Sequence, residues 1–159
     1  MTRTLILLRH AKSAWPADTP DVLRPLAERG RRDAPAVGRW LREHAGPIEL
    51  VLCSPAVRAA QTWELAAAEL LVAPPVRHDE RLYGASASEL LTVTHELPAQ
   101  VSTAVLVGHN PGLEDFLTRL TGARERLKTS TIAVITAPGS WTATIPSSCS
   151  LHTLATPRG

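Results

Sequence analysis

The chain has 159 residues, 44% of them hydrophobic and 20% charged, with a formal net charge of +2. This composition excludes a disordered chain, and the length predicts a single domain, residues 1–159, around one core. The longest apolar run, residues 5–8, ends at Arg9 and His10 and is far shorter than the roughly 20 residues of a membrane helix. The first residues also lack the pattern of a signal peptide. We therefore expect a cytoplasmic protein with no membrane partner.

The charge balance and the cysteine count argue against a nucleic-acid-binding protein and against a disulfide scaffold. The excess of positive charge is small, no long basic tract occurs and aromatic residues make up only 4%, so nucleic acid is not expected as a partner. The only cysteines, Cys53 and Cys149, do not form a C-x-x-C pair. They are too few for a disulfide scaffold and are expected to be reduced structural thiols.

Short apolar runs alternate with longer helical patterns along the chain. Residues 4–8, 49–53 and 104–107 are predicted to be strands buried on both faces. Residues 26–44 have the pattern of a helix. Pro35 either kinks this helix or interrupts it, in which case the helix restarts with Asp33 as its cap. Alternation of this kind predicts a mostly parallel sheet with helices on both sides, a three-layer α/β/α sandwich.

Two helix starts follow predicted strands closely. Ser54-Pro55 and Asn110-Pro111 each combine a capping side chain with proline at the first helical position. Gly122 is a natural end for the second of these helices. Its apolar face is made by Leu113, Phe116, Leu117 and Leu120.

The remaining elements are less regular. Residues 86–97 predict another helix. Residues 131–136 and 140–145 predict late strands joined by a turn at Pro138-Gly139, with a further short strand near Leu151. The last four residues, 156–159, are expected to be loose.

Charged side chains gather where the three buried strands end. Ligand sites of open parallel sheets lie beyond the carboxyl ends of the strands. Arg9 and His10 end the first strand, Arg58 lies in the first helical turn after the second, and His109 follows the third. Alone, each is equally typical of a surface or turn residue. Their joint placement at one sheet edge favours a common site.

These residue types suit a phosphoryl group. Arginine offers a rigid fork of N–H donors that matches phosphate oxygens, and helix N-termini after Pro55 and Pro111 would add backbone N–H groups. Imidazole attacks phosphorus in its neutral form, and Arg9 and Arg58 are expected to lower the pKa of His10. The sequence therefore predicts an anion site with its own nucleophile.

Four blocks of the chain resemble the histidine phosphatase superfamily, which has the phosphoglycerate-mutase-like fold. Residues 8–13 resemble its Arg-His signature, and residues 24–30 are similar to its Leu-Thr-x-x-Gly stretch. Residues 54–62 match its Ser-x-x-x-Arg-x-x-Gln-Thr block, and residues 108–110 match its late Gly/Ser-His motif. The resemblance spans about two-thirds of the chain in the family's order.

The resemblance implies roles for these residues. His10 would be the phosphorylated nucleophile, while Arg9, Arg58 and His109 would hold the phosphoryl oxygens. No metal and no cofactor is implied, because phosphoryl transfer mostly needs positioning and charge stabilisation.

Three further positions keep two interpretations each. Ala11 and Lys12 depart from the family's pattern, so Lys12 is either a phosphate contact or a solvated loop residue. Ser13 either donates to the phosphate or caps a turn. Glu80, in a segment similar to the family's Glu-Arg-x-Tyr-Gly, is either the general acid for the leaving group or an ordinary loop carboxylate. Among the tryptophans, Trp15 is predicted at the mouth of the site and the core is predicted to hold Trp40, Trp63 and Trp141.

The short chain leaves no room for insertions that would cover the site, so an open pocket is expected. Compact members resemble the SixA-like branch, which removes phosphate from histidine on signalling proteins. Imidazole is also a better leaving group than an alkoxide. A phosphohistidine protein is thus the expected substrate, and the alternatives are a small phosphomonoester or a binding module without turnover. A mutase is disfavoured, because it needs an enclosed pocket, and the protein is expected to be monomeric.

Overall fold

Six strands form one mixed sheet in the computed structural model, which describes residues 1–159. The strand order is β3-β2-β4-β1-β5-β6. The first four of these strands are mutually parallel, whereas β5 runs antiparallel to both β1 and β6. The predicted mostly parallel sheet is confirmed. The bounds of the strands are β1 (Thr2–Arg9), β2 (Leu50–Cys53), β3 (Val76–His78), β4 (Thr103–Gly108), β5 (Ile132–Pro138) and β6 (Ser150–Ala155).

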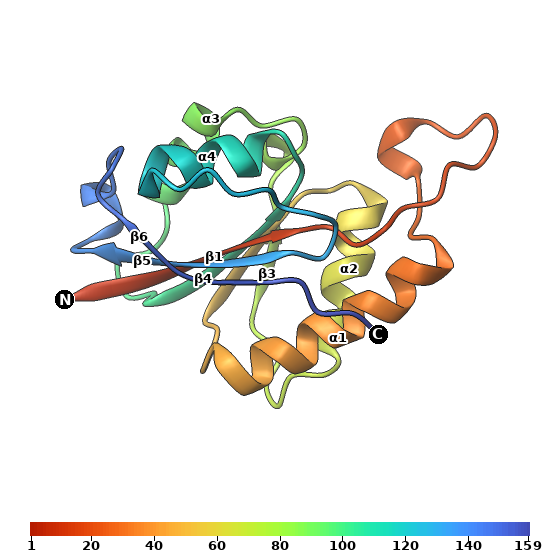
Figure 1. The fold of residues 1–159 in the computed structure, drawn as a ribbon, viewed down its shortest axis with the longest axis horizontal. Coiled ribbons are helices and arrows are strands. Elements are labelled where there is room, and N and C mark those ends of the chain that lie inside the picture. The colour runs from red at the N-terminus through yellow and green to blue at the C-terminus, as the bar shows by residue number, and fades with distance from the viewer.

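Two helices cover each face of this sheet (Figure 1). On one face lie α1 (Glu28–His44) and α2 (Val57–Ala67), and on the other lie α3 (Ala87–His95) and α4 (Gly112–Thr121). The predicted α/β/α sandwich is therefore confirmed. None of the four helices has both the length and the apolar character needed to cross a membrane.

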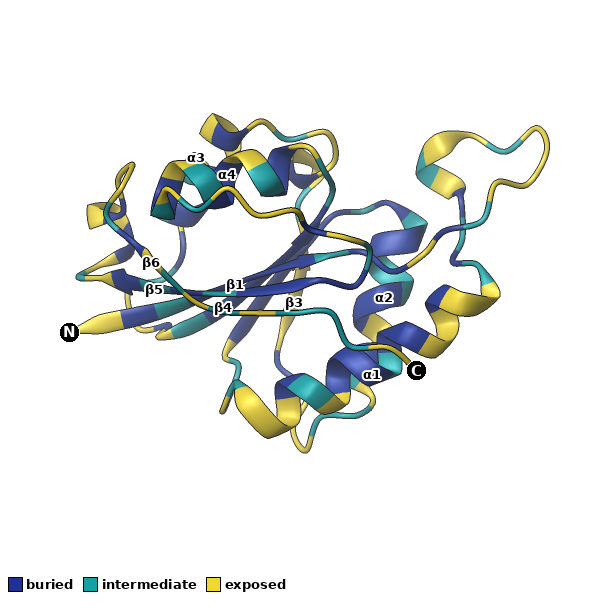
Figure 2. Cartoon of the chain, in the orientation of Figure 1, coloured by how far each residue is buried: buried dark blue, intermediate teal, exposed yellow.

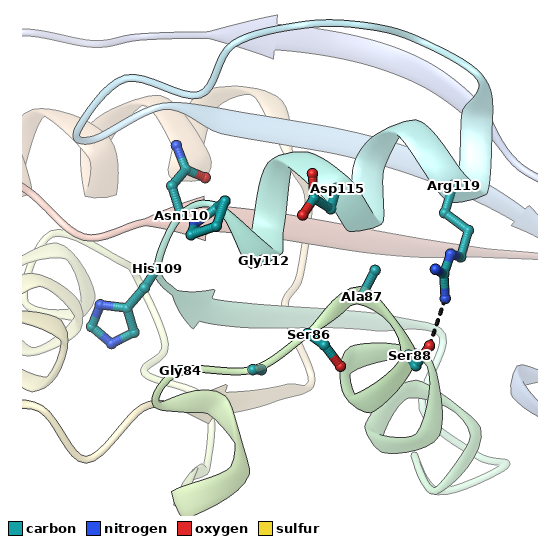
Figure 3. Close-up of a pocket in the computed structure, with 11 residues that line it drawn as sticks. Gly84, Ser86, Ala87, Ser88, His109, Asn110, Gly112, Asp115 and Arg119 are labelled. Carbon is teal, nitrogen blue, oxygen red and sulfur yellow. Dashed lines mark hydrogen bonds between the residues drawn. The ribbon is translucent and has the colours of Figure 1, made fainter.

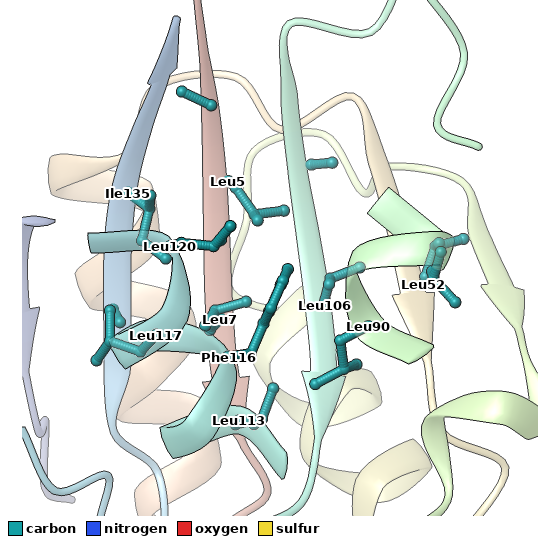
Figure 4. Close-up of a cluster of buried hydrophobic side chains, with 14 of the residues drawn as sticks. Leu5, Leu7, Leu52, Leu90, Leu106, Leu113, Phe116, Leu117, Leu120 and Ile135 are labelled. Carbon is teal, nitrogen blue, oxygen red and sulfur yellow. The ribbon is translucent and has the colours of Figure 1, made fainter. Parts of the chain in front are cut away.

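The central strand β1 supplies side chains to two hydrophobic layers. Leu5 and Leu7 face α3 and α4, where Phe116 packs against them (Figure 4). Ile6 and Leu8 point to the opposite side, against α1 and α2. All of these side chains are fully buried, and the central strands are buried along most of their length (Figure 2). Burying each leucine stabilises the fold by roughly 1.5–3 kcal/mol, so β1 is held rigidly where it approaches the site.

Helix α1 is continuous, so Pro35 does not interrupt it and the expected restart is wrong. The helix runs from Glu28 to His44 with Pro35 inside it. Asp33 does not cap a second helix, because its buried carboxylate accepts hydrogen bonds from Arg158 and from the backbone N–H of Gly159. The same contacts anchor the last residues of the chain, so the expectation that residues 156–159 are loose is wrong.

The predicted strand at residues 140–145 is also wrong. A single 3₁₀ turn, Trp141–Ala143, occupies this segment, and the indole of Trp141 is buried and donates to the carbonyl of Val101. The hydrogen bond and burial of Trp141 hold the backbone in a turn. The chain returns to the sheet only at β6, which confirms the short strand expected near Leu151.

The helix ends agree with the predictions in part. Gly122 ends α4 in the left-handed conformation, as expected. Neither Ser54 nor Asn110 is an N-cap, because α2 begins at Val57 after Ala56 and α4 begins at Gly112. Both of these side chains contribute to the site instead. Helix α3 begins with a reciprocal pair in which Ser86 accepts from the N–H of Glu89 and Glu89 accepts from the N–H of Ser86.

Candidate active site

The site lies at the carboxyl end of β1, as the sequence predicts. Arg9 is the last residue of the strand, and the N–H of His10 donates to the carbonyl of Gly108 at the end of the neighbouring β4. On the other side, the N–H of Ser130 donates to the carbonyls of Arg9 and His10. His10 is thereby fixed between two strands and lies beside His109.

The backbone after His10 is held by helix α2. The hydroxyl of the buried Thr62 accepts from the N–H of Ala11 at 2.9 Å and donates to the carbonyl of Arg58 at 2.7 Å. The neighbouring Gln61 accepts from the N–H of Leu26 at 2.8 Å. The Gln-Thr pair of the resemblance block therefore orients the nucleophile's loop.

All of the predicted site residues except Glu80 line one cavity of about 230 Å³, called here the anion pocket. The ring centroids of its two histidines lie 5.1 Å apart. Lys12 and Ser13 also line it, as does Trp15, which is 75% exposed and lies at the mouth as expected. No aspartate or glutamate is among the lining residues. The structure brings together here the predicted nucleophile and its predicted phosphate contacts, which are Arg9, His10, Arg58 and His109.

His10 presents a free, unprotonated ring nitrogen to the pocket. Its Nδ1 lies 2.7 Å from the carbonyl oxygen of Ala11. A carbonyl can only accept, so Nδ1 carries the proton and Nε2 keeps its lone pair. Burial, with smaller contributions from His109 and the nearby arginines, lowers the pKa of His10 to about 3. The ring is therefore neutral near pH 7, in the form that attacks phosphorus.

The second histidine is also neutral. The Nε2 atom of His109 lies 2.8 Å from the hydroxyl oxygen of Ser54, and the edge of the Tyr83 ring packs against it at a centroid distance of 5.6 Å. Burial, followed by the charge of Arg58, lowers the pKa of His109 to about 4. A bound anion would favour the protonated ring, so His109 is suited to stabilise negative charge that arrives with a ligand.

A carboxylate that the sequence analysis missed organises the arginines. Asp21 lies 3.1 Å from one Nη of Arg58 and 2.8 Å from one Nη of Arg24, and it accepts from the hydroxyl of Tyr83 at 2.6 Å. The hydrogen bond from Tyr83, then those from Arg24 and Arg58, hold the pKa of Asp21 well below its usual range. Arg24 also donates to Ser13 and stacks on the indole of Trp15.

The remaining donors are oriented from the opposite side of the pocket. Arg9 donates to the carbonyl of Leu127 at 3.0 Å, and its Nε atom is buried without a partner. The amide of Asn110 donates to the same carbonyl and to the carboxylate of Glu114. Arg9 thus retains an unused N–H donor beside the nucleophile.

The structure does not bring Glu80 to the anion pocket. Glu80 is exposed on a 3₁₀ turn, Glu80–Leu82, its side chain forms no hydrogen bond or ion pair, and it is not among the lining residues. The turn directs the chain so that Tyr83, three residues later, reaches Asp21 instead. The segment's resemblance to the family motif could have indicated Tyr83, but no signal in the sequence pairs it with Asp21.

The tryptophans follow the predictions with one difference. Trp63 and Trp141 are buried in the core as expected, whereas Trp40 is only half-buried and stacks on His44. The cysteines are free and buried, and burial raises the pKa of Cys53 to about 12. Neither thiol takes part in the site.

A neutral imidazole facing a cluster of arginines is an arrangement for transferring a phosphoryl group to nitrogen. The model of the histidine phosphatase superfamily (branch 1) matches residues 5–131. The chain belongs to this superfamily. His10, Arg58 and His109 lie within the matched residues.

Similar proteins agree with this membership of the histidine phosphatase superfamily. The uncharacterized protein Rv1276c of Mycobacterium tuberculosis is 36% identical over 162 residues, which cover 95% of this chain and 100% of the relative. A SixA structure from Nakamurella multipartitia has a TM-score of 0.86 and 30% identity, covering 99% of this chain and 97% of that chain. The protein histidine phosphatase SixA complexed with tungstate has a TM-score of 0.84 at 22% identity, covering 97% of both chains, and shows the same fold.

Proposed function

We propose that this histidine phosphatase hydrolyses phosphohistidine on a protein through a phosphorylated His10. In the first step, Nε2 of His10 forms a bond to phosphorus while the bond from phosphorus to the substrate's imidazole nitrogen breaks. Water then attacks the phosphorus of phospho-His10, which releases orthophosphate and restores the neutral ring. The proposal involves no metal and no cofactor, because Arg9, Arg58 and His109 supply the charge that stabilises the transition state.

The absence of a carboxyl group from the lining of the anion pocket carries the choice of substrate. An alkyl phosphomonoester needs its leaving oxygen protonated. Asp21 cannot supply that proton, since Tyr83 and two arginines hold its pKa low, and Glu80 is not at the pocket. The ring of phosphohistidine can take up a proton from solvent on its other nitrogen and then departs as neutral imidazole. It therefore needs no acid from the protein, which favours phosphohistidine over a phosphomonoester.

The exposure of the pocket supports a macromolecular substrate. Lys12 and Trp15 at its mouth are exposed, and no segment of the chain covers them. The tungstate held by the SixA structure is a tetrahedral oxyanion like phosphate. For this chain we infer that phosphate binds in the anion pocket, which Arg9 and Arg58 line. A small phosphomonoester is the second candidate, because the same arginines would hold its phosphate.

The test compares two substrates in the presence of a chelator. We expect turnover of a phosphohistidine protein at least about 10-fold faster than that of an aryl phosphate, with acid-labile phosphate trapped on His10 from both. His10→Ala is expected to lower turnover by at least about 10³-fold while it retains phosphate binding, as for other lost nucleophiles. Arg58→Ala is expected to weaken both binding and turnover.

The outcomes separate the candidate functions. Equal or faster turnover of the aryl phosphate would favour the small-molecule phosphatase. Phosphate binding with no turnover and no labelled His10 would favour a binding module. Wild-type turnover by His10→Ala would contradict the mechanism itself.

A further inference from the structure

A second cavity opens off the anion pocket, and the mechanism above does not use it. This side groove has a volume of about 460 Å³ and shares His109 and Asn110 with the anion pocket, whereas His10 lines only the anion pocket. The side groove therefore begins at the proposed phosphate-binding residue His109 and extends between residues 84–88 and α4 as far as Arg119 (Figure 3). One wall is residues 84–88, and the other is α4, whose lining residues include Gly112 and Asp115 in its first turn and Arg119 in its last turn.

The side groove is a built feature of the fold. The segment 84–88 touches the start of α4 so closely that a Cβ atom at Gly112 would lie 2.1 Å from the carbonyl oxygen of Ala85. Farther along, Arg119 donates to the hydroxyl of Ser88 at 2.8 Å and joins the two walls. Residues 84–88 are all glycine, alanine or serine, and their short side chains leave the space between the two walls open.

The walls are polar and accessible. Ser86, Ser88, Asp115 and Arg119 are all exposed, so a ligand can enter along the length of the groove and not only at one end. Neither Asp115 nor Arg119 forms an ion pair within the protein. The groove therefore offers an unpaired carboxylate near its start and an unpaired guanidinium at its far end.

The length of the groove exceeds what an imidazole needs. Gly112 and Arg119 are seven residues apart on one helix, which at about 1.5 Å per residue extends over roughly 10 Å. An extended peptide advances about 3.3 Å per residue, so this distance corresponds to about three residues. An acidic side chain near the phosphohistidine would be repelled by Asp115, while one about three residues away would reach Arg119.

We propose that the side groove binds the polypeptide segment that carries the phosphohistidine, and that Arg119 selects segments with an acidic residue about three positions from it. This inference rests on the proposed function, since it concerns the polypeptide that carries the phosphohistidine in the same reaction. Arg119 acts here as a specificity residue and takes no part in the transfer of phosphorus.

The test uses two synthetic peptides of glycine and serine with a single phosphorylated histidine. One has glutamate at the third position on either side of the histidine, and the other has lysine there. Dividing kcat/KM for each peptide by that for phosphoramidate on the same variant isolates the effect of the carrier. The variants are Arg119→Glu and the matched control Arg124→Glu, which makes the same charge change at an exposed residue outside the groove.

We expect wild-type protein to favour the glutamate peptide by about fivefold, the scale of an exposed ion pair. Arg119→Glu is expected to invert this preference, and Arg124→Glu to keep it. Equal preference in wild-type protein and Arg119→Glu, or none in wild-type protein, would overturn the proposal.

A binding measurement separates this inference from the proposed function. Fluorescence anisotropy gives the Kd of both labelled peptides for His10→Ala, with and without Arg119→Glu, and needs no turnover. A glutamate preference that Arg119→Glu inverts supports the side groove even if wild-type protein hydrolyses neither peptide, in which case only the proposed function fails. Binding without that preference would overturn the proposed role of the side groove. The proposed function would still be decided by the hydrolysis measurement.

Discussion

His10, the proposed nucleophile, owes its neutral form with a free Nε2 to its neighbour in the chain. The carbonyl of Ala11 fixes the proton on Nδ1 of His10, and burial keeps the ring neutral. A carboxylate partner is therefore unnecessary for the tautomer. The carboxylate near the pocket, Asp21, binds the arginines instead.

Asp21 competes with a ligand for Arg58. Asp21→Asn removes a negative charge 3.1 Å from the guanidinium while it keeps the size of the side chain. We expect inorganic phosphate to bind several-fold more tightly to this variant, because phosphate no longer has to displace the half-exposed Asp21 carboxylate from Arg58, a change on the order of 1 kcal/mol. Isothermal titration calorimetry measures the Kd. Asp18→Asn, in the same loop and without a side-chain contact, is the control, and weaker binding by Asp21→Asn would show that Asp21 positions Arg58 instead.

Residues at strand ends could be predicted from the sequence, and residues brought together by loops could not. Arg9, His10 and His109 follow buried strands, so the general rule for parallel sheets places them at one edge. Asp21 and Tyr83 are 62 positions apart in irregular segments and meet only through one hydrogen bond. No periodicity marks such a pair.

At the scale of elements, hydrophobic patterns predicted the strands and helices correctly where buried residues recur along the whole element. The apolar runs of β1, β2 and β4 and the face of α4 were predicted because every turn or pleat repeats the signal. Strand β3 was missed because its three residues are all exposed and carry no such pattern. Residues 140–145 alternate like a strand, but the buried indole of Trp141 and its hydrogen bond favour a turn.

The first turn of α3 depends on its reciprocal cap. Ser86→Ala removes the acceptor of the Glu89 N–H and is expected to lower the free energy of unfolding by about 1 kcal/mol. Urea denaturation monitored by circular dichroism measures the change. Ser102→Ala, at an exposed serine whose side chain forms no hydrogen bond, is the matched control. Equal stability of the two variants would contradict a stabilising cap.

At the scale of the whole molecule, the two histidines of the anion pocket oppose folding in acid. Burial lowers the pKa of His10 to about 3 and that of His109 to about 4, below the ~6.5 of an unperturbed histidine. Between these values and about 6.5, the unfolded chain binds more protons than the folded chain. The free energy of unfolding therefore decreases as the pH falls through this window.

We expect this decrease to be on the order of 1 kcal/mol per pH unit for each histidine. His109→Asn removes one of the two contributions, so its stability is expected to decline less steeply between about pH 6.5 and pH 4.5. Urea denaturation at several pH values gives the slopes, with Ser102→Ala as the control that keeps the wild-type slope. Parallel slopes for wild-type protein and His109→Asn would show that the ring is not held neutral by the fold.

The sheet order has a consequence for how the protein is made. Within the sheet, β1 is translated before both of its neighbours, which are residues 103–108 and 132–138. A nascent chain therefore exposes an apolar strand with two unpaired edges until most of the sequence has been synthesised, which makes it a natural binding segment for chaperones. His10, the proposed nucleophile, is therefore synthesised long before Gly108 and Ser130, whose backbone groups hold it in place.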